Sequence, residues 1–111
     1  MIFSELAEFA NEFKRLAKKY HSLAADFTEF KRVISVRPLG DGKHFNVITR
    51  NDFFAIVKAR LFCRYLQGAA LRVIYAHYFD GSKIEFLEIY FKGKQEAENN
   101  GRIKGYLKKH V

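Results

Sequence analysis

Basic residues at a strand-like spacing are the first candidates for chemistry in this sequence. Lys58, Arg60 and Arg64 occupy even positions of a β-rich run, and Arg72 opens the next run. Because side chains alternate across a strand, the first three are predicted to share one face. Arg72 joins them if the intervening hairpin has a regular register. Four cations would repel one another on a merely solvated face, so we favour a surface that binds phosphate.

Tyrosine side chains follow the same alternation. On the second run Tyr78 and Arg72 both occupy even positions, and on the third run Tyr90 and Lys92 do so too, so each pair is expected to share a face of its strand. A surface that combines guanidinium and ammonium groups with a phenol can hold RNA phosphates and stack a base. It can also stabilise the charge of a pentacoordinate phosphorus.

The histidines and carboxylates give weaker signals. His77 falls on the alternating positions that are predicted to face the core, which favours a buried, hydrogen-bonded histidine over a general base. His44 lies in a loop and could reach a substrate, although an ordinary exposed side chain is the better interpretation. Glu85 and Glu88 fall on opposite faces of a regular strand, so they are not expected to form a paired acid site. Glu88 could face the cationic surface as a base or as a counter-charge, and we favour the counter-charge. The sequence has no phosphate-cradling glycine loop, nucleophile elbow or zinc spacing, so no metal or other cofactor is expected.

Composition narrows the class of protein and its partners. The 111 residues fit one domain, residues 1–111, and the apolar fraction of 49% favours a packed globule. The formal net charge of +8 indicates a polyanionic partner, either nucleic acid or an acidic protein. Cys63 has no second cysteine to pair with, and the amino terminus has no signal-peptide or membrane-span pattern. We therefore expect a cytoplasmic location.

Two amphipathic helices are predicted in the first third of the chain. Apolar residues recur at intervals of three and four over residues 4–20, with Ser4 as the expected N-cap. Ser22 can cap a second predicted helix, which ends at Arg37 because the residue before Pro38 is pushed out of the α region. The short connection predicts an antiparallel helical hairpin.

The remaining elements are predicted to be a loop, strands and one short helix. Residues 39–51 carry two glycines and predict a long loop, with a short strand at residues 45–48. Residues 55–92 hold three β-rich runs separated by polar turns, the pattern of an antiparallel meander. A weakly specified helix is expected around residues 103–107. This order predicts an α+β fold, with the hairpin packed on one face of a small antiparallel sheet and cations on the other.

The ordered segments resemble a known family. FKRLAKKYHSL, IVKARLFCRYL, LRVIYAHYF and KIEFLEIYFKG follow one another over nearly the whole chain. Together they are similar to the RelE/ParE superfamily of toxins from bacterial toxin-antitoxin pairs. The most specific features are the basic pair Lys58 and Arg60, the arginine at position 72 before an apolar strand, and the Lys92-Gly93-Lys94 turn.

The resemblance implies a small α+β toxin encoded beside an acidic antitoxin. In the RelE branch such a toxin enters the ribosomal A site and cleaves mRNA by attack of a ribose 2′-hydroxyl on the adjacent phosphate. Lys58, crowded by arginines, is then expected to have a lowered pKa and to act as the base. Arg60 and Arg72 are expected to hold the phosphate and its developing charge.

This chain departs from the family pattern near its carboxyl end. RelE-like nucleases tend to have an arginine after the last strand and a tyrosine in the last helix, whereas this chain has Lys94, Gln95, Asn99 and Asn100 there. The residue that donates a proton to the leaving oxygen could therefore be Tyr78, Tyr90 or Tyr106. The amino-terminal strand of the family is expected to be abbreviated to residues 1–3. The catalytic residues expected are Lys58, Arg60, Arg72 and Tyr90, and further RNA contacts are expected from Arg64, Tyr78, Lys92 and Lys94.

Two alternatives to a nuclease remain. The first is a ParE-like toxin that inhibits DNA gyrase by binding and does not need Lys58 or Arg72. The second is a catalytically inactive domain that binds only nucleic acid or an antitoxin, with salt-sensitive affinity for RNA.

Overall fold

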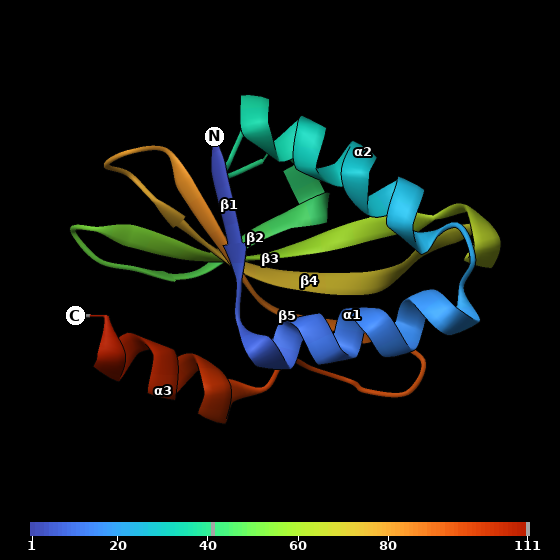
Figure 1. Ribbon diagram of the computed structural model, residues 1–111. Coiled ribbons are helices and arrows are strands. Elements are labelled where there is room, and N and C mark those ends of the chain that lie inside the picture. The colour runs from blue at the N-terminus through green and yellow to red at the C-terminus, as the bar shows by residue number, and fades with distance from the viewer. Residues whose placement is uncertain (41, 111) are drawn as a thin grey trace.

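The computed structural model describes residues 1–40 and 42–110; Asp41, within the predicted loop, and Val111, at the end of the predicted domain, lie outside the described residues. The chain has an α+β fold with a five-stranded sheet in the order β1-β5-β4-β3-β2 (Figure 1). None of the helices in these described ranges is long and apolar enough to cross a membrane. The helices are α1 (Ala7–Lys19), α2 (Leu23–Val36) and α3 (Asn100–Lys109), and the strands are β1 (Ile2–Glu5), β2 (Phe45–Arg50), β3 (Phe54–Cys63), β4 (Gly68–Tyr78) and β5 (Lys83–Phe91).

The helical hairpin covers one face of the sheet, as predicted. α1 and α2 run in opposite directions along that face (Figure 1). Phe9 of α1 and Phe27 of α2 meet Phe86 of β5, with ring centroids 5.3 Å and 4.9 Å from that of Phe86. The periodic apolar side chains of both helices therefore enter one core with the inward side chains of the sheet.

The three central strands form the predicted antiparallel meander. β3 pairs with β4, and β4 pairs with β5, both antiparallel. Gln67 and Gly81 occupy the two connections with φ values of 56° and 80°. This left-handed backbone is what tight hairpin connections require, so the polar turns occur where the sequence indicated them.

The amino-terminal prediction is wrong in one respect. α1 begins at Ala7 with Leu6 as its N-cap, and Ser4 does not cap it. Ser4 lies in β1, which pairs in parallel with β5, and its hydroxyl donates to Glu85 Oε2 over 3.1 Å. Phe3 stacks on Phe86 at 5.8 Å, so sheet pairing and ring packing hold these residues in a strand that is longer than residues 1–3.

The predicted loop at residues 39–51 contains more structure than expected. A short 3₁₀ turn at Gly42–His44 leads into β2, which extends to Arg50 rather than to residue 48. β2 pairs antiparallel with β3 and forms an edge of the sheet. The 3₁₀ turn and β2 therefore lie directly beside β3.

The second face of the sheet is divided between a small core and a cationic region. Phe54, Ile56 and Leu87 pack against Ile103 and Tyr106 of α3. The prediction of a wholly cationic face is therefore wrong at this end, because the amphipathic α3 covers it. The cations expected there can be exposed only on the part that α3 leaves uncovered.

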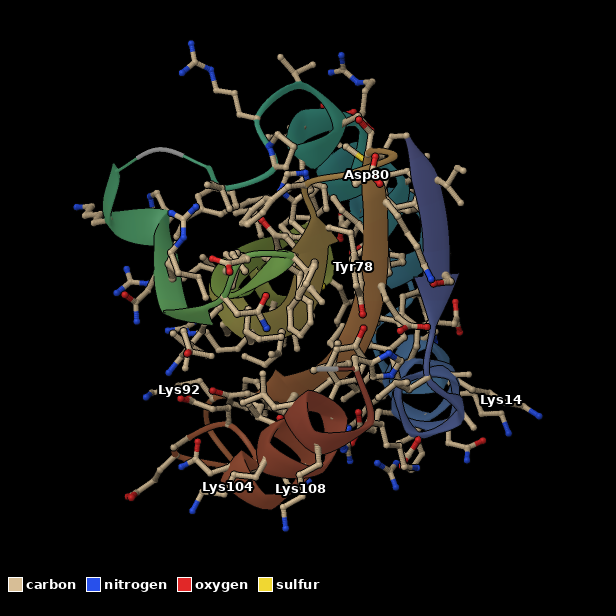
Figure 2. The ribbon with its side chains drawn as sticks, turned by 90° about the vertical axis from the view of Figure 1, so that its left-hand side faces the viewer. Lys14, Tyr78, Asp80, Lys92, Lys104 and Lys108 are labelled. Atoms are coloured by element: carbon tan, nitrogen blue, oxygen red, sulfur yellow. The ribbon has the colours of Figure 1, made fainter. Side chains whose placement is uncertain are left out.

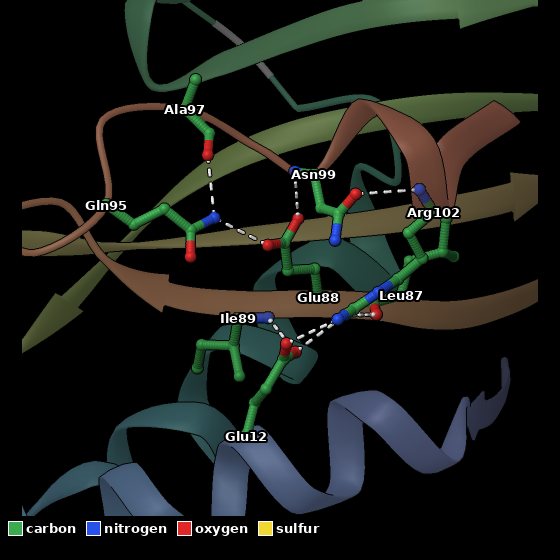
Figure 3. A network of polar contacts seen from close by, with 8 residues as sticks. All are labelled: Glu12, Leu87, Glu88, Ile89, Gln95, Ala97, Asn99 and Arg102. Atoms are coloured by element: carbon green, nitrogen blue, oxygen red, sulfur yellow. Dashed lines mark hydrogen bonds and ion pairs between the residues drawn. The ribbon is translucent and has the colours of Figure 1, made fainter.

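Replacing Glu12 with glutamine is expected to lower the free energy of unfolding by about 2 kcal/mol, because it breaks the charged link between α1 and α3. Arg102 Nη1 and Nη2 donate to the two Glu12 oxygens over 2.9 Å and 2.8 Å, and Nη1 also donates to Leu87 O (Figure 3). Both side chains are only 16% exposed. Urea unfolding measures the loss, with exposed Glu96→Gln as the control. Equal stabilities of the two variants would contradict a role for this link.

Candidate phosphate-binding site

A cationic cleft lies on the sheet face beside α3. Its volume is about 290 Å³, and its walls come from the 3₁₀ turn, β2, β3, β4 and the residue after β5. Cations from four separate segments converge there, which is the arrangement that a polyanion needs. The lining residues are Lys43, His44, Phe45, Asn46, Lys58, Ala59, Arg60, Arg72 and Lys92.

Strand register places the central cations side by side. Arg60 of β3 is the direct partner of Arg72 of β4, which in turn is the partner of Tyr90 of β5. Arg72 therefore joins the face of Arg60, although the hairpin between them is not regular throughout, because its register shifts between Leu61 and Cys63. Like charges directly opposite each other destabilise a sheet, so this pair favours an anion between or above the two guanidinium groups.

Arg72 is held in place by the backbone. Its Nη1 donates to Ala69 O over 2.6 Å and to Leu71 O over 3.2 Å. Burial, reinforced by the nearby charge of Arg60, lowers the pKa of Arg72. The guanidinium is thus pre-positioned and partly desolvated, which strengthens its interaction with a phosphate.

Lys58 has an acidic partner that sequence analysis missed. Its Nζ donates to Glu98 Oε1 over 2.9 Å, and the side chains are 25% and 16% exposed. The hydrogen bond from Lys58 to Glu98 outweighs burial and raises the pKa of Lys58. The predicted lowering of this pKa by neighbouring arginines is therefore wrong. An ammonium in this state can stabilise negative charge but cannot accept a proton.

The connector between β5 and α3, residues 92–99, contacts several predicted site residues. Lys92 Nζ donates to Glu96 O over 2.8 Å, which ties its ammonium to this segment. Tyr90 is 4% exposed, and its hydroxyl has no hydrogen-bond partner among the described residues. Burial raises the pKa of Tyr90, although the Lys58 charge opposes this effect. The phenol is therefore neutral and keeps its proton.

Arg64 does not share the face of Lys58 and Arg60, so that prediction is wrong. The register of β3 shifts between Leu61 and Cys63, and Arg64 falls in a 3₁₀ turn rather than in the strand. Its Nε donates to Asp26 Oδ1 of α2 over 2.9 Å. Strand alternation ends at the shift, and Asp26 then holds the guanidinium on the helical side.

Tyr90 lines a separate depression rather than the cleft, and three further candidates also lie outside the cleft lining. Tyr78 packs under α3, where its hydroxyl contacts that of Tyr106, and Figure 2 shows it apart from Lys92. Tyr106 in turn donates to Glu85 Oε1 over 2.7 Å, and burial raises its pKa. Lys94 lines the same depression as Tyr90, together with Lys19 of α1. The roles of these residues in RNA binding or as an acid stay predictions.

Glu85 and Glu88 face the same side, contrary to the expectation from strand alternation. The register of β4 and β5 shifts between Ile74 and Tyr75, which turns two successive β5 residues toward α3. Glu88 is 3% exposed and accepts from Gln95 Nε2 and Asn99 N, each over 2.8 Å (Figure 3). Glu88 therefore anchors the connector, and the expectation of a counter-charge to the cationic surface is wrong.

Lys43, His44 and Glu98 were not predicted as site residues. Lys43 and His44 enter the cleft from the 3₁₀ turn, and the only sequence signal for them was the length of their loop. Glu98 lies 40 residues from its partner Lys58, and no local pattern marks such a contact.

Comparisons with known proteins were made for the sequence and for the fold. No protein-family model and no curated protein matches the sequence. One similar solved structure is the crystal structure of the archaeal RelE–RelB complex from Pyrococcus horikoshii OT3, with a TM-score of 0.64 and 18% sequence identity. The match covers 84% of this chain and 96% of that chain. At this identity the likeness shows the architecture, and we conclude that the chain has a RelE-like fold.

Proposed function

We propose that the protein is the toxin of a toxin-antitoxin pair and cleaves mRNA on the ribosome. The observation that carries the proposal is the direct pairing of Arg60 with Arg72 in the lining of a cationic cleft. This arrangement suits a phosphodiester, because two guanidinium groups can hold its non-bridging oxygens from one side.

In the proposed reaction a ribose 2′-hydroxyl attacks the adjacent phosphate. Arg60 and Arg72 bind the phosphate, and protonated Lys58 adds a third positive charge where the pentacoordinate phosphorus forms. Neutral Tyr90, whose buried hydroxyl has no hydrogen-bond partner among the described residues, is a candidate for donating a proton to the leaving oxygen once that oxygen can reach it. The reaction would take place in the cytoplasm, where mRNA is translated.

We infer an acidic antitoxin as the partner of this surface. The formal net charge of +8 supports an acidic segment that covers the cleft. The similar archaeal protein was crystallised as a complex of RelE with RelB, which also supports the inference. Such a segment would compete with RNA for the same cations.

Expression of the wild-type protein without a partner is expected to arrest bacterial growth and to produce mRNA cut within codons on translating ribosomes. Mapping of RNA 5′ ends measures the cuts. Gyrase supercoiling activity in the same cells should be unaffected. Growth arrest with intact mRNA and inhibited gyrase would instead support a ParE-like inhibitor.

A binding domain without catalysis is the second candidate. The observation that favours a binding domain is the Lys58–Glu98 ion pair, because Glu98 neutralises the charge of Lys58, a predicted catalytic residue. Salt-sensitive RNA affinity with neither turnover nor growth arrest would support it.

A further inference from the structure

The cleft has cations for the phosphate but needs a group that removes the proton of the attacking hydroxyl. Lys58 is protonated and already donates to Glu98. Glu88 is buried with its oxygens hydrogen-bonded by the connector, and Glu85 is bound by Ser4 and Tyr106 under α3. None of these three is available as a base.

Glu98 differs from the other carboxylates near the sheet. Its Oε1 lies 2.9 Å from the Lys58 ammonium, which itself lines the cleft. The carboxylate also accepts a hydrogen bond from its own backbone N–H, Lys58 is the one side chain that bonds it among the described residues, and the side chain is 16% exposed. The carboxylate is thus held beside Lys58 at the edge of the cleft, and its remaining lone pairs can accept a further hydrogen bond.

The connector presents Glu98 in a fixed position. Buried Glu88 binds Gln95 on one side of Glu98 and Asn99 on the other, and Gln95 Nε2 also donates to Ala97 O over 2.8 Å (Figure 3). Asn99 then caps α3 by accepting from Arg102 N. A segment anchored on both sides by a buried carboxylate holds a side chain more precisely than a free surface loop does.

We propose that Glu98 is a catalytic residue whose carboxylate accepts the proton of the attacking 2′-hydroxyl, while Lys58 remains charged beside it. This inference rests on the proposed ribonuclease function. The 2′-oxygen forms a bond to phosphorus as its proton passes to Glu98 Oε2, and the bond from phosphorus to the 5′-oxygen breaks. The leaving 5′-oxygen takes a proton from Tyr90, the candidate acid, or directly from solvent; Glu98 later returns its proton to solvent, and Tyr90 regains one. The products are a 2′,3′-cyclic phosphate and a 5′-hydroxyl.

Replacement of Glu98 with glutamine tests the proposal in single-turnover cleavage of ribosome-bound mRNA. E98Q is expected to lower the rate by about 100-fold or more, the usual effect of a general base. Its affinity for RNA should be equal or higher, because a negative charge is removed. The matched control is E96Q, which removes the same charge from the same connector at an exposed side chain and should retain the wild-type rate.

A cleavage rate of E98Q equal to or above that of the wild type would overturn the proposal, because Glu98 would then only restrain Lys58. Loss of RNA binding or of the folded state together with the rate would assign Glu98 a structural role and would also overturn it. Absence of cleavage by the wild-type protein would overturn the proposed function itself. Wild-type cleavage with an active E98Q would overturn only the role of Glu98.

The pH profile of the wild-type rate provides a second test. Burial would raise the pKa of Glu98, but the hydrogen bonds from Lys58 and from its own backbone N–H and the charge of Lys92 lower it. Tyr90 near Glu98 and His44 in the lining of the cleft are further titratable groups. With Glu98 as the base, the rate should be nearly constant between about pH 6 and 9. With Lys58 as the base, the rate would rise about tenfold per pH unit over the same range, because its pKa is raised. Such a rise would contradict the assignment.

Discussion

Replacement of Arg72 with alanine is expected to reduce the rate of RNA cleavage by about 100- to 1,000-fold, the cost of removing one preorganised group from a developing oxyanion. Arg72 lies directly opposite Arg60, and its guanidinium is oriented by the carbonyls of Ala69 and Leu71. Alanine removes the charge together with this orientation. Single-turnover cleavage of ribosome-bound mRNA measures the loss.

A matched control distinguishes the site from the overall charge. Arg32 lies on the surface of α2, where it pairs with Glu29 and is 75% exposed. Arg32→Ala lowers the net charge by the same amount and should leave the rate within about twofold of the wild type, as expected for a surface position. If R72A and R32A were equally active, the cleft would not be the site of the reaction.

Replacement of Phe86 with alanine is expected to lower the free energy of unfolding by about 3–5 kcal/mol, the usual cost of deleting a buried phenyl ring. Phe86 is 1% exposed at the point where both helices meet the sheet. Its ring contacts those of Phe3, Phe9, Phe27 and Tyr75 at centroid distances of 4.9–6.1 Å. Alanine would leave a cavity among four aromatic rings.

Urea unfolding of the purified protein measures this loss. The control is Phe53→Ala in the connection between β2 and β3, where the ring is 63% exposed and should contribute less than about 0.5 kcal/mol. Similar losses for the two variants would contradict the position of the core.

The parts of the fold that follow local patterns were predicted from the sequence. The apolar spacing of α1 and α2 and the alternation in β3, β4 and β5 each depend on neighbouring residues, and they led to the correct layers. β1 was underestimated because four residues carry little pattern and depend on distant β5 for their hydrogen bonds. α3 was expected to be weak, yet its docking depends on Arg102 and Glu12, which are 90 residues apart.

The alternation of side chains along a strand predicted the site correctly only where the strands are regular. It correctly joined Arg60 to Arg72, because no shift separates them from the centre of the meander. It failed for Arg64 and Glu88, each of which follows an irregularity that reverses or ends the alternation. The pKa of Lys58 was predicted in the wrong direction because Glu98 approaches it from a different segment.

The chemistry of the RNA ends tests the central claim most directly. Purified protein is incubated with translating ribosomes, and the termini of the cleaved mRNA are identified by their reactivity toward ligation and phosphorylation. Attack by the 2′-hydroxyl predicts a 2′,3′-cyclic phosphate on one fragment and a 5′-hydroxyl on the other, and the R72A variant should produce neither at an appreciable rate. Fragments with a 3′-hydroxyl and a 5′-phosphate, or intact mRNA, would contradict the claim.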